Sequence, residues 1–327
     1  MKVFNDIHTP LDLKNAVVTI GTFDGVHLGH QAIFNEMRRL ADELGGAAVV
    51  VTFYPHPRQV LEIETKTLRF ICSQEEKLQK FEDYGIDDVV IIPFTKAFAA
   101  TPSEVFVKDY IIDKLHPSVI MVGYDHHFGK NREGDYEMLN ALGEQYGFKT
   151  VQVEAQYVNN VAVSSTKIRK ALWEGDVKTA NQMLGYPYAV SGIVVKGNQI
   201  GRTIGFPTAN LDIPNEFMMI NNPGVYACKT VIDGKTYNAM ANTGFRPTIK
   251  ELAESGKLRA ENSQLSALSS QLKIEVNVFD FNGDLYGKTL KVWFIERIRD
   301  EVKFQGLEAL KAQLQQDRVE AKKILSL

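Results

Sequence analysis

The sequence predicts an α/β protein of two domains: an N-terminal doubly wound parallel sheet and a C-terminal antiparallel β-barrel with a terminal helix. Three observations lead to this prediction. Apolar, β-branched runs alternate with amphipathic segments through the first half of the chain. Hairpin turn signals replace that alternation after about residue 184. The length of 327 residues is generous for one domain and suits two.

Five apolar runs in the first half predict the strands of the sheet. These are Val17–Ile20, Ala47–Phe53, Asp88–Ile92, Ser118–Val122 and Thr150–Val153. Helices are expected between them at Gln31–Leu44, Gln74–Tyr84, Ser103–Leu115 and Tyr136–Tyr146. The first helix has an apolar face, made by Ile33, Phe34, Met37, Leu40, Ala41 and Leu44, and ends at Gly45. This alternation predicts a parallel sheet covered on both faces, with ligands at the carboxyl ends of its strands.

The second half is expected to form hairpins around two turn dipeptides. Asp233-Gly234 separates the runs Tyr226–Ile232 and Lys235–Met240. Asn282-Gly283 separates Ile274–Phe281 and Asp284–Phe294. Both dipeptides suit type I′ turns, whose two central residues need positive φ. A compact antiparallel barrel follows from this pattern.

The remaining segments complete the predicted organisation. An amphipathic helix over Gly306–Leu325 is expected to pack on the outside of the barrel. Gly185 and Pro187 mark the boundary, which gives domains of residues 1–185 and 186–327. Glu251–Gln271 is polar and is interpreted as an inserted loop or short helices.

Composition argues against several classes of partner. A net charge of −3 gives no reason to expect nucleic acid or an anionic membrane. Cys72 and Cys228 have neither metal-ligand spacing nor the number that a disulfide framework needs. Met1–Leu11 lacks the apolar core of a signal peptide, and no apolar run approaches the ~20 residues of a membrane helix. We therefore expect a cytoplasmic protein.

The most informative run is Gly21-Thr22-Phe23-Asp24-Gly25-Val26-His27-Leu28-Gly29-His30, between the first predicted strand and helix. Its glycines let backbone N–H groups approach an anion, and the start of the following helix contributes partial positive charge. His27 and His30 can each donate to a phosphate oxygen, and either can become imidazolium as negative charge builds. The alternative is a glycine turn with two incidental histidines, which leaves their occurrence beside Phe23-Asp24-Gly25 unexplained. The run predicts a nucleotide phosphate site.

Two later stretches fit the same site. Gly123–Gly129, with Asp125, His126 and His127, follows a predicted strand and is expected at the same edge of the sheet. A metal site at these three residues is an alternative, although adjacent residues rarely ligate one ion well. Ser164–Arg169 offers three hydroxyls and two cations at the start of a predicted helix. This segment is either a second phosphate clamp or an ordinary helix N-cap.

A second constellation lies within Gly197–Asn210. Gly201 and Gly205 flank the cation Arg202, and the run ends in Phe206-Pro207-Thr208-Ala209-Asn210. The Thr208 hydroxyl and the Asn210 carbonyl are hard oxygen ligands of the kind that nucleotide-bound Mg²⁺ uses. The residues alone leave open a barrel corner with glycines at its bends.

These stretches resemble two known families. Gly21–His30, Gly123–Asp135 and Ser164–Arg169 resemble the nucleotidyltransferase module of FAD synthetases, within the wider superfamily that carries a His-x-Gly-His motif. Gly205–Asn210 resembles the signature of riboflavin kinases, and later stretches of that family are matched in order by Pro223–Tyr226, Asn242–Thr248 and Glu275–Phe281. The resemblance covers nearly the whole chain and points to the fused bacterial riboflavin kinase/FAD synthetases.

The resemblance implies two ATP-dependent reactions of flavin cofactor biosynthesis. The C-terminal domain would phosphorylate riboflavin to FMN. The N-terminal domain, with a Rossmann-like sheet, would adenylylate FMN to FAD and release pyrophosphate. ATP is implied as co-substrate and Mg²⁺ as cofactor. The implied partners are riboflavin, FMN and ATP, with neither nucleic acid nor membrane.

The resemblance also implies residue roles. The ATP-binding residues of the adenylyltransferase would be Gly21, Phe23, His27, His30, Asp125, Ser164, Ser165, Thr166 and Arg169, with the two histidines acting on the α- and β-phosphates. The ATP site of the kinase would be formed by Gly201, Arg202, Gly205, Pro207, Thr208 and Asn210. Thr208 and Asn210 would hold the metal. Glu275 would be the general base for the attacking hydroxyl, a role that suits a carboxylate.

Three features of the kinase half depart from the usual family pattern. Asn277 stands where many members have His, Phe245 replaces a commoner small polar residue, and residues 250–272 are longer than expected. One alternative is therefore an FAD synthetase with a weakened kinase half. Another is a flavin-binding regulatory or storage protein, against which the intact histidines and Glu275 argue.

Overall fold

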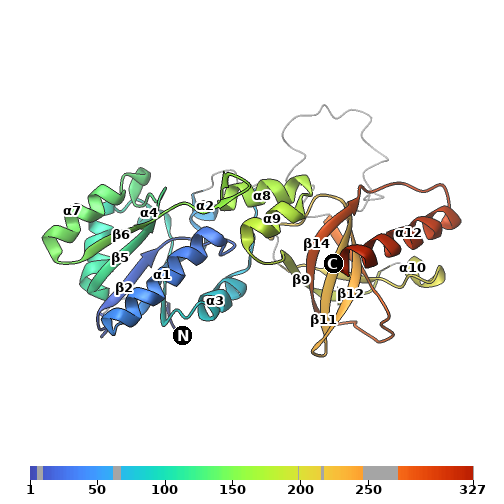
Figure 1. The fold of residues 1–327 in the computed structure, drawn as a ribbon, viewed down its shortest axis with the longest axis horizontal. Coiled ribbons are helices and arrows are strands. Elements are labelled where there is room, and N and C mark those ends of the chain that lie inside the picture. Colours follow the sequence, from blue (N-terminus) through green and yellow to red (C-terminus); the bar gives the residue numbers. More distant parts are fainter. Residues whose placement is uncertain (6–9, 62–67, 198, 215–216, 246–271, 327) are drawn as a thin grey trace. The chain divides into compact units, whose positions relative to one another are not determined.

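The computed structural model describes the chain except for residues 6–9, 62–67, 198, 215–216, 246–271 and 327. The chain forms two compact units, one of residues 1–68 and 72–165, the other of residues 69–71 and 166–327. Each unit contains a β-sheet of its own (Figure 1). The predicted polar segment Glu251–Gln271 and the Arg246-Pro247-Thr248 stretch lie outside the described residues.

The first unit is built on a parallel sheet, as predicted, with six strands where five were expected. Its strands are β1 (Lys2–Asn5), β2 (Ala16–Ile20), β3 (Ala48–Tyr54), β4 (Asp88–Pro93), β5 (Pro117–Gly123) and β6 (Lys149–Val153). Their order is β1-β4-β3-β2-β5-β6, and every pairing is parallel. The edge strand β1 was not predicted, because its four largely exposed residues lack an apolar run.

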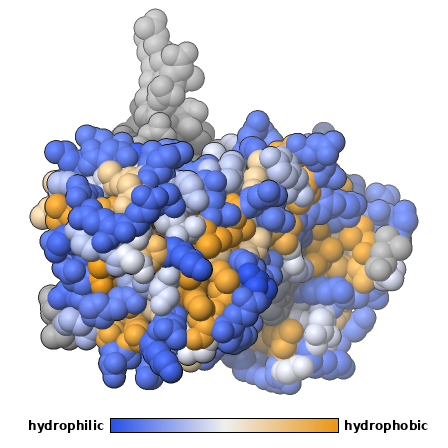
Figure 2. Space-filling model, turned by 60° about the vertical axis from the view of Figure 1, so that its left-hand side comes forward, coloured by the Kyte–Doolittle hydropathy of each residue, from blue (hydrophilic) through white to orange (hydrophobic). Residues whose placement is uncertain are grey.

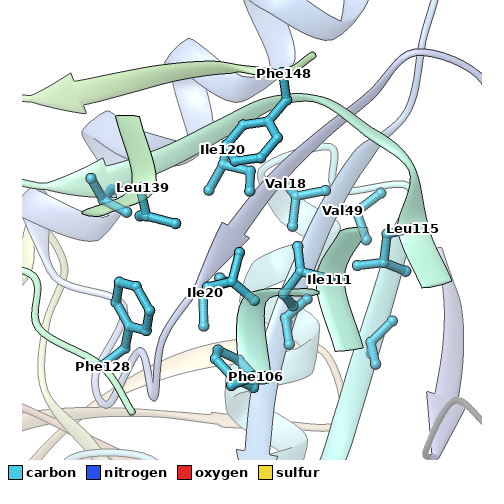
Figure 3. Close-up of a cluster of buried hydrophobic side chains, with 14 of the residues drawn as sticks. Val18, Ile20, Val49, Phe106, Ile111, Leu115, Ile120, Phe128, Leu139 and Phe148 are labelled. Atoms are coloured by element: carbon cyan, nitrogen blue, oxygen red, sulfur yellow. The ribbon is translucent and has the colours of Figure 1, made fainter. Parts of the chain in front are cut away.

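Helices cover both faces of this sheet because successive strand residues point to opposite sides. Val17 and Met121 pack with α1 (Leu28–Leu44) and α3 (Gln74–Asp83). Val18 and Ile20 lie in the opposite cluster, with side chains from the helical segments α5 (Ser103–Phe106), η1 (Val107–Ile112), α6 (Asp113–Leu115) and α7 (Tyr136–Tyr146) (Figure 3). The predicted helix Ser103–Leu115 is thus one continuous helical stretch with a π-helical centre. Each fully buried Val, Ile or Phe side chain stabilises the fold by roughly 1.5–3 kcal/mol.

The first helix differs from its prediction at its start and in one residue of its apolar face. It begins at Leu28, three residues earlier than expected, so His27 is the N-cap residue and His30 lies in the first turn. Gly45, with φ 59°, ends the helix as predicted. Leu44, expected on the apolar face, is exposed, because it is the last helical residue and the chain turns away at Gly45.

The second unit contains the predicted closed barrel. Its strands are β9 (Ala189–Val195), β10 (Ala209–Asp212), β11 (Gly224–Ile232), β12 (Lys235–Phe245), β13 (Leu272–Val278) and β14 (Thr289–Arg299), in the closed order β10-β13-β12-β11-β14-β9. All pairings are antiparallel. The hairpin at Asp233-Gly234 is confirmed, with φ of 50° and 77°.

The second predicted hairpin is wrong. β13 pairs with β10 and β12, whereas β14 pairs with β9 and β11. Residues 279–288 therefore connect two strands that are not neighbours, and neither Asn282 nor Gly283 has the positive φ of a type I′ turn. The Asn282-Gly283 dipeptide indicates only that a turn is locally favourable. Which strands pair is decided by contacts between residues distant in sequence.

A terminal helix, α12 (Leu307–Leu325), packs on the barrel as predicted, with Ala321 and Leu325 buried beside Met240 and Phe279. Its buried Asp317 accepts two hydrogen bonds from the guanidinium of Arg299 on β14, at 2.7 and 2.8 Å. Two further helices precede the barrel, α8 (Ser165–Glu174) and α9 (Val177–Leu184). Short elements complete the fold: α2 (Pro57–Val60), α4 (Lys96–Ala99), η2 (Lys130–Arg132), β7 (Tyr157–Val158), β8 (Val161–Ala162) and α10 (Ile200–Thr203).

Candidate active sites

The run Gly21–His30 leaves the carboxyl end of β2, a central strand with β3 on one side and β5 on the other. Phe23, Gly25 and Val26 have φ of 50°, 79° and 38°. Positive φ strains Phe and, above all, β-branched Val, so such a loop persists only where the surroundings hold it. We call residues 21–30 the phosphate loop.

Side chains from three elements hold the carbonyls of the phosphate loop. Gln31 Nε2 on α1 donates to Val26 O at 2.8 Å, and Ser165 Oγ at the start of α8 donates to Asp24 O at 2.9 Å. Lys77 Nζ on α3 donates to Thr22 O at 3.1 Å. The loop is therefore fixed before any ligand binds.

The two histidines of the loop are stacked. Their ring centroids are 3.6 Å apart with 19° between the ring planes, and the Phe23 ring meets the His30 ring edge-on at 5.1 Å. Glycines make room for this arrangement. A Cβ on Gly29 would lie 3.2 Å from His27 Cε1, and a Cβ on Gly21 would lie 2.9 Å from Phe23 Cζ.

His30 is neutral in the free protein at neutral pH. Burial lowers the pKa of His30 well below its ordinary value, and the neighbouring His27 and Lys77 lower it further. A neutral imidazole can donate one hydrogen bond, and at the first turn of α1 it adds to the positive end of the helix dipole. Both properties suit an anionic ligand.

The other predicted residues of this site are partly brought together. Asp125 lies exposed in the turn after β5, the neighbour of β2, so it is at the expected edge of the sheet. Ser164 immediately precedes α8, and Ser165 contacts the phosphate loop through Asp24 O. Thr166 and Arg169 belong to the second compact unit, where Arg169 Nη2 lies 3.4 Å from Thr166 Oγ1.

In the barrel, the segment before β10 folds tightly on itself. Phe206 N donates to Gly201 O at 2.7 Å, and a Cβ on Gly201 would lie 2.1 Å from Phe206 O. Gly205 has φ 85°, and the side chain of Arg202 is exposed. Both glycines are thus required by the backbone, one by close approach and one by its dihedral angle.

Glu275 lies at the centre of a row of polar residues across three strands. It pairs with Asn210 on β10 and with Asn242 on β12. Directly opposed residues of antiparallel strands share one face, so the three side chains project to the same side. Thr208, two residues before Asn210, leads into the same strand. A Cβ on Gly197 would lie 2.3 Å from Asn210 Nδ2, so Gly197 leaves the space that the Asn210 side chain fills.

Asn277, one of the departures from the family pattern, is tied to the signature segment. Its buried Nδ2 donates to Pro207 O at 2.7 Å. It therefore joins β13, which carries Glu275, to the residues before Thr208. Phe245 ends β12, and nothing is described of its side chain.

Sequence reasoning missed two residues in these sites, Asn242 and Lys77. Lys77 is buried on the same face of α3 as Phe81, four residues later. The sequence could have indicated it, because a lysine at a position that helical spacing assigns to the core is unusual. Asn242 stands in a stretch that matches the riboflavin kinase family, but its place opposite Glu275 had no signal before the register was known. Within the described residues, no group of three or more His, Cys, Asp or Glu side chains could hold a metal ion.

Apolar side chains are scattered over the surface of the described residues. On the face drawn in Figure 2, apolar patches lie among hydrophilic side chains. No helix in the described part of the chain is both long and apolar enough to cross a bilayer.

The first unit has a histidine-bearing loop at the centre of a parallel sheet, which is typical of nucleotidyltransferases. The second unit is a barrel that carries a glycine-containing loop and a glutamate, as a small-molecule kinase would. Together they indicate a nucleotidyltransferase fused to a small-molecule kinase. Comparison with known proteins makes this specific. The family model of FAD synthetase matches residues 9–167, and that of riboflavin kinase matches residues 184–325.

Full-length relatives agree. The bifunctional riboflavin kinase/FMN adenylyltransferase of Buchnera aphidicola subsp. Acyrthosiphon pisum is 35% identical, over 97% of this chain and 96% of the relative. The protein of the same name from Bacillus subtilis strain 168 is 37% identical, over 94% of this chain and 91% of its own. A crystal structure from Streptococcus pneumoniae, named macrolide-efflux protein, superposes with a TM-score of 0.84 at 30% identity, covering 98% of this chain and 99% of its own.

The chain belongs to the family of bifunctional riboflavin kinases/FMN adenylyltransferases. It phosphorylates riboflavin to FMN with ATP, and it adenylylates FMN to FAD with release of pyrophosphate. The predicted pair of activities is confirmed, and ATP and the flavins are its small-molecule substrates and products.

Proposed function

We propose that residues 1–185 adenylylate FMN and residues 186–327 phosphorylate riboflavin. The compact units divide earlier, between Ser165 and Thr166, but two observations support the later boundary. Helix α9 ends at Leu184 with Gly185 in the left-handed conformation, and the first barrel strand begins at Ala189. The two family models also divide between residues 167 and 184.

In the adenylyl transfer, an oxygen of the FMN phosphate attacks the α-phosphorus of ATP, and the bond from that phosphorus to the bridging oxygen breaks. Pyrophosphate leaves. The FMN phosphate is ionised at neutral pH, so the step needs positioning and charge stabilisation rather than a strong base. His27 and His30 bind the α- and β-phosphates. The observation that carries this assignment is their 3.6 Å stack at the start of α1.

The remaining residues of the adenylyltransferase site bind the rest of ATP. Gly21 and Phe23 shape the phosphate loop, and Asp125 binds the nucleoside or the flavin. Ser164, Thr166 and Arg169 add phosphate contacts. Ser165 fixes the phosphate loop instead, because its hydroxyl already donates a hydrogen bond to Asp24 O.

In the kinase reaction, Glu275 takes the proton of the riboflavin 5′-hydroxyl as that oxygen attacks the γ-phosphorus of ATP, and ADP leaves. Gly201, Arg202, Gly205 and Pro207 form the loop that holds the nucleotide. The register that sets Glu275 opposite Asn210 supports the assignment.

Mg²⁺ fits the kinase site through the Thr208 hydroxyl and the Asn210 side-chain carbonyl. Both are hard oxygens two residues apart in an extended segment, and Gly197 leaves the space that Asn210 occupies. When bound, the ion neutralises charge on the ATP phosphates.

We further propose that the protein acts in the cytoplasm on small molecules alone, without nucleic acid or membrane partners, which its net charge of −3 supports. The test of the site assignments uses purified protein with riboflavin, ATP and Mg²⁺, with products separated by chromatography. Glu275→Ala should abolish FMN formation and spare FAD formation from FMN, whereas His27→Ala should do the reverse. Loss of both activities in a folded variant would contradict the division of roles.

A further inference from the structure

A buried lysine lies directly beneath the phosphate loop. Lys77 on α3 is 6% exposed, and its Nζ donates to Thr22 O at 3.1 Å and to Thr52 Oγ1 on β3 at 3.2 Å. Thr52 is fully buried. Lysine is rarely buried, because removing its charge from water is costly unless that charge is used.

The surroundings of Lys77 compensate its charge with a residue of the loop itself. Burial lowers the pKa of Lys77, and the neighbouring Cys72 and Asp24 oppose that effect. Asp24 is buried in the phosphate loop. It accepts from the backbone N–H of Cys72 at 3.4 Å, while Gly25 N donates to Cys72 Sγ at 3.2 Å. The segment leading into α3 and the loop are therefore joined at several points.

The carbonyl that Lys77 holds stands at the start of the strained part of the loop. Thr22 directly precedes Phe23, and Phe23 and Val26 both have positive φ. Because the C=O and the next N–H of a planar peptide point in opposite directions, fixing Thr22 O also fixes the direction of Phe23 N–H. Without that contact the strain would favour a different loop conformation.

The same ammonium acts on His30. The charge of Lys77 is one of the causes that keep His30 neutral. Positive charge near His30 therefore comes from Lys77, a side chain buried beneath the phosphate loop. A fixed charge in a dry environment acts strongly on a developing anion and needs no reorganisation.

We propose that Lys77 is a positioning residue of the adenylyl transfer: it holds the Thr22 carbonyl, and so the phosphate loop, and it places an ammonium group close to the histidines that receive the triphosphate. Lys77 itself contacts no substrate. The inference rests on the proposed role of His27 and His30.

The test compares Lys77→Met, which keeps the length and apolar stem, with Thr52→Val, which removes one acceptor without changing shape. Lys149→Met is the control, since Lys149 is exposed on β6 of the same unit. The measurements are kcat and the KM for ATP in FAD formation from FMN, with riboflavin phosphorylation recorded on the same preparations.

Lys77→Met should raise the KM for ATP about tenfold or more and lower kcat, because the loss of a buried charge-assisted contact is worth at least that factor. Thr52→Val should raise the same KM about threefold, because it removes one of two contacts. Riboflavin phosphorylation and the control should stay within twofold of the unmodified protein.

An unchanged KM for ATP overturns the proposal, even if kcat falls, because a smaller folded fraction lowers kcat alone. If Lys77→Met does not fold, Thr52→Val decides by the same criterion. His27→Ala separates the two levels of inference. If His27→Ala still forms FAD at the full rate, the proposed function is wrong. If His27→Ala loses FAD formation while the KM for ATP of Lys77→Met is unchanged, only the role of Lys77 is wrong.

Discussion

Replacing Gly201 with alanine should disable riboflavin phosphorylation and leave FAD formation intact. The new Cβ would lie 2.1 Å from Phe206 O, where ordinary contacts begin at 3.4 Å. The obstacle is backbone carbonyl, so it cannot be relieved by a side-chain rotation, and one segment must move by about 1 Å. Phe206 leads directly to Pro207 and Thr208, and Pro207 O is held by Asn277. The displacement therefore reaches the residues proposed to bind ATP.

A misplacement of about 1 Å in a positioning group costs roughly a hundredfold in rate. We expect that loss in FMN formation from riboflavin, measured as initial rates by chromatography, with FAD formation from FMN unchanged. Gly234→Ala is the matched control, since Gly234 has φ 77° with nothing within 4 Å of its Cβ and lies in the β11–β12 turn. It should cost about 1 kcal/mol of stability from backbone strain and little kinase activity. Kinase activity within threefold of the unmodified protein in Gly201→Ala would refute the reasoning.

Three further outcomes are expected. Glu275→Gln, which keeps size but not basicity, should lower FMN formation about 10²- to 10⁴-fold and leave FAD formation from FMN within twofold; more than a tenth of normal kinase activity would place the base elsewhere. Asp317→Asn leaves Arg299 partly buried without its carboxylate and should destabilise the barrel by about 3 kcal/mol in urea unfolding, so an unchanged midpoint would count against the pair. Burial lowers the pKa of His126 to about 4, below the ordinary value of 6.5, so the native state binds fewer protons between these values. The free energy of unfolding should have its full value above pH 6.5 and decline by about 2–3 kcal/mol as the pH falls to 4. His126→Gln should make that decline smaller. An equal decline in the variant would contradict the prediction.

Elements with a long, regular pattern could be predicted from the sequence. The strands β2 to β6 and four helices of the first unit follow from alternating apolar runs, because burial on both sheet faces gives β2 to β5 a strong signal, while β6 is a partly exposed edge strand. The Asp233-Gly234 turn was predictable because it joins two strands that are adjacent both in sequence and in the barrel. The Asn282-Gly283 turn was not, because β13 and β14 take their partners from elsewhere in the barrel.

The candidate sites were predictable where a residue stands in a motif. His27, His30 and Glu275 lie in recognisable runs, and the structure adds the ring stack and the register. Lys77 and Asn242 were missed because each gains its place from strands or loops distant in sequence. The start of α1 was missed because Gly29 and His30 are weak helix formers, although both lie in its first turn.

The closed barrel dictates an order of assembly on the ribosome. All six strands of the parallel sheet precede residue 154, whereas β9, at Ala189–Val195, pairs with β14, at Thr289–Arg299. At roughly 5–20 residues per second, β9 and β11 each wait several seconds with one unpaired edge before β14 emerges. The adenylyltransferase half can thus be complete while the kinase half is still open, so the protein is built in the reverse of the order in which its two reactions run.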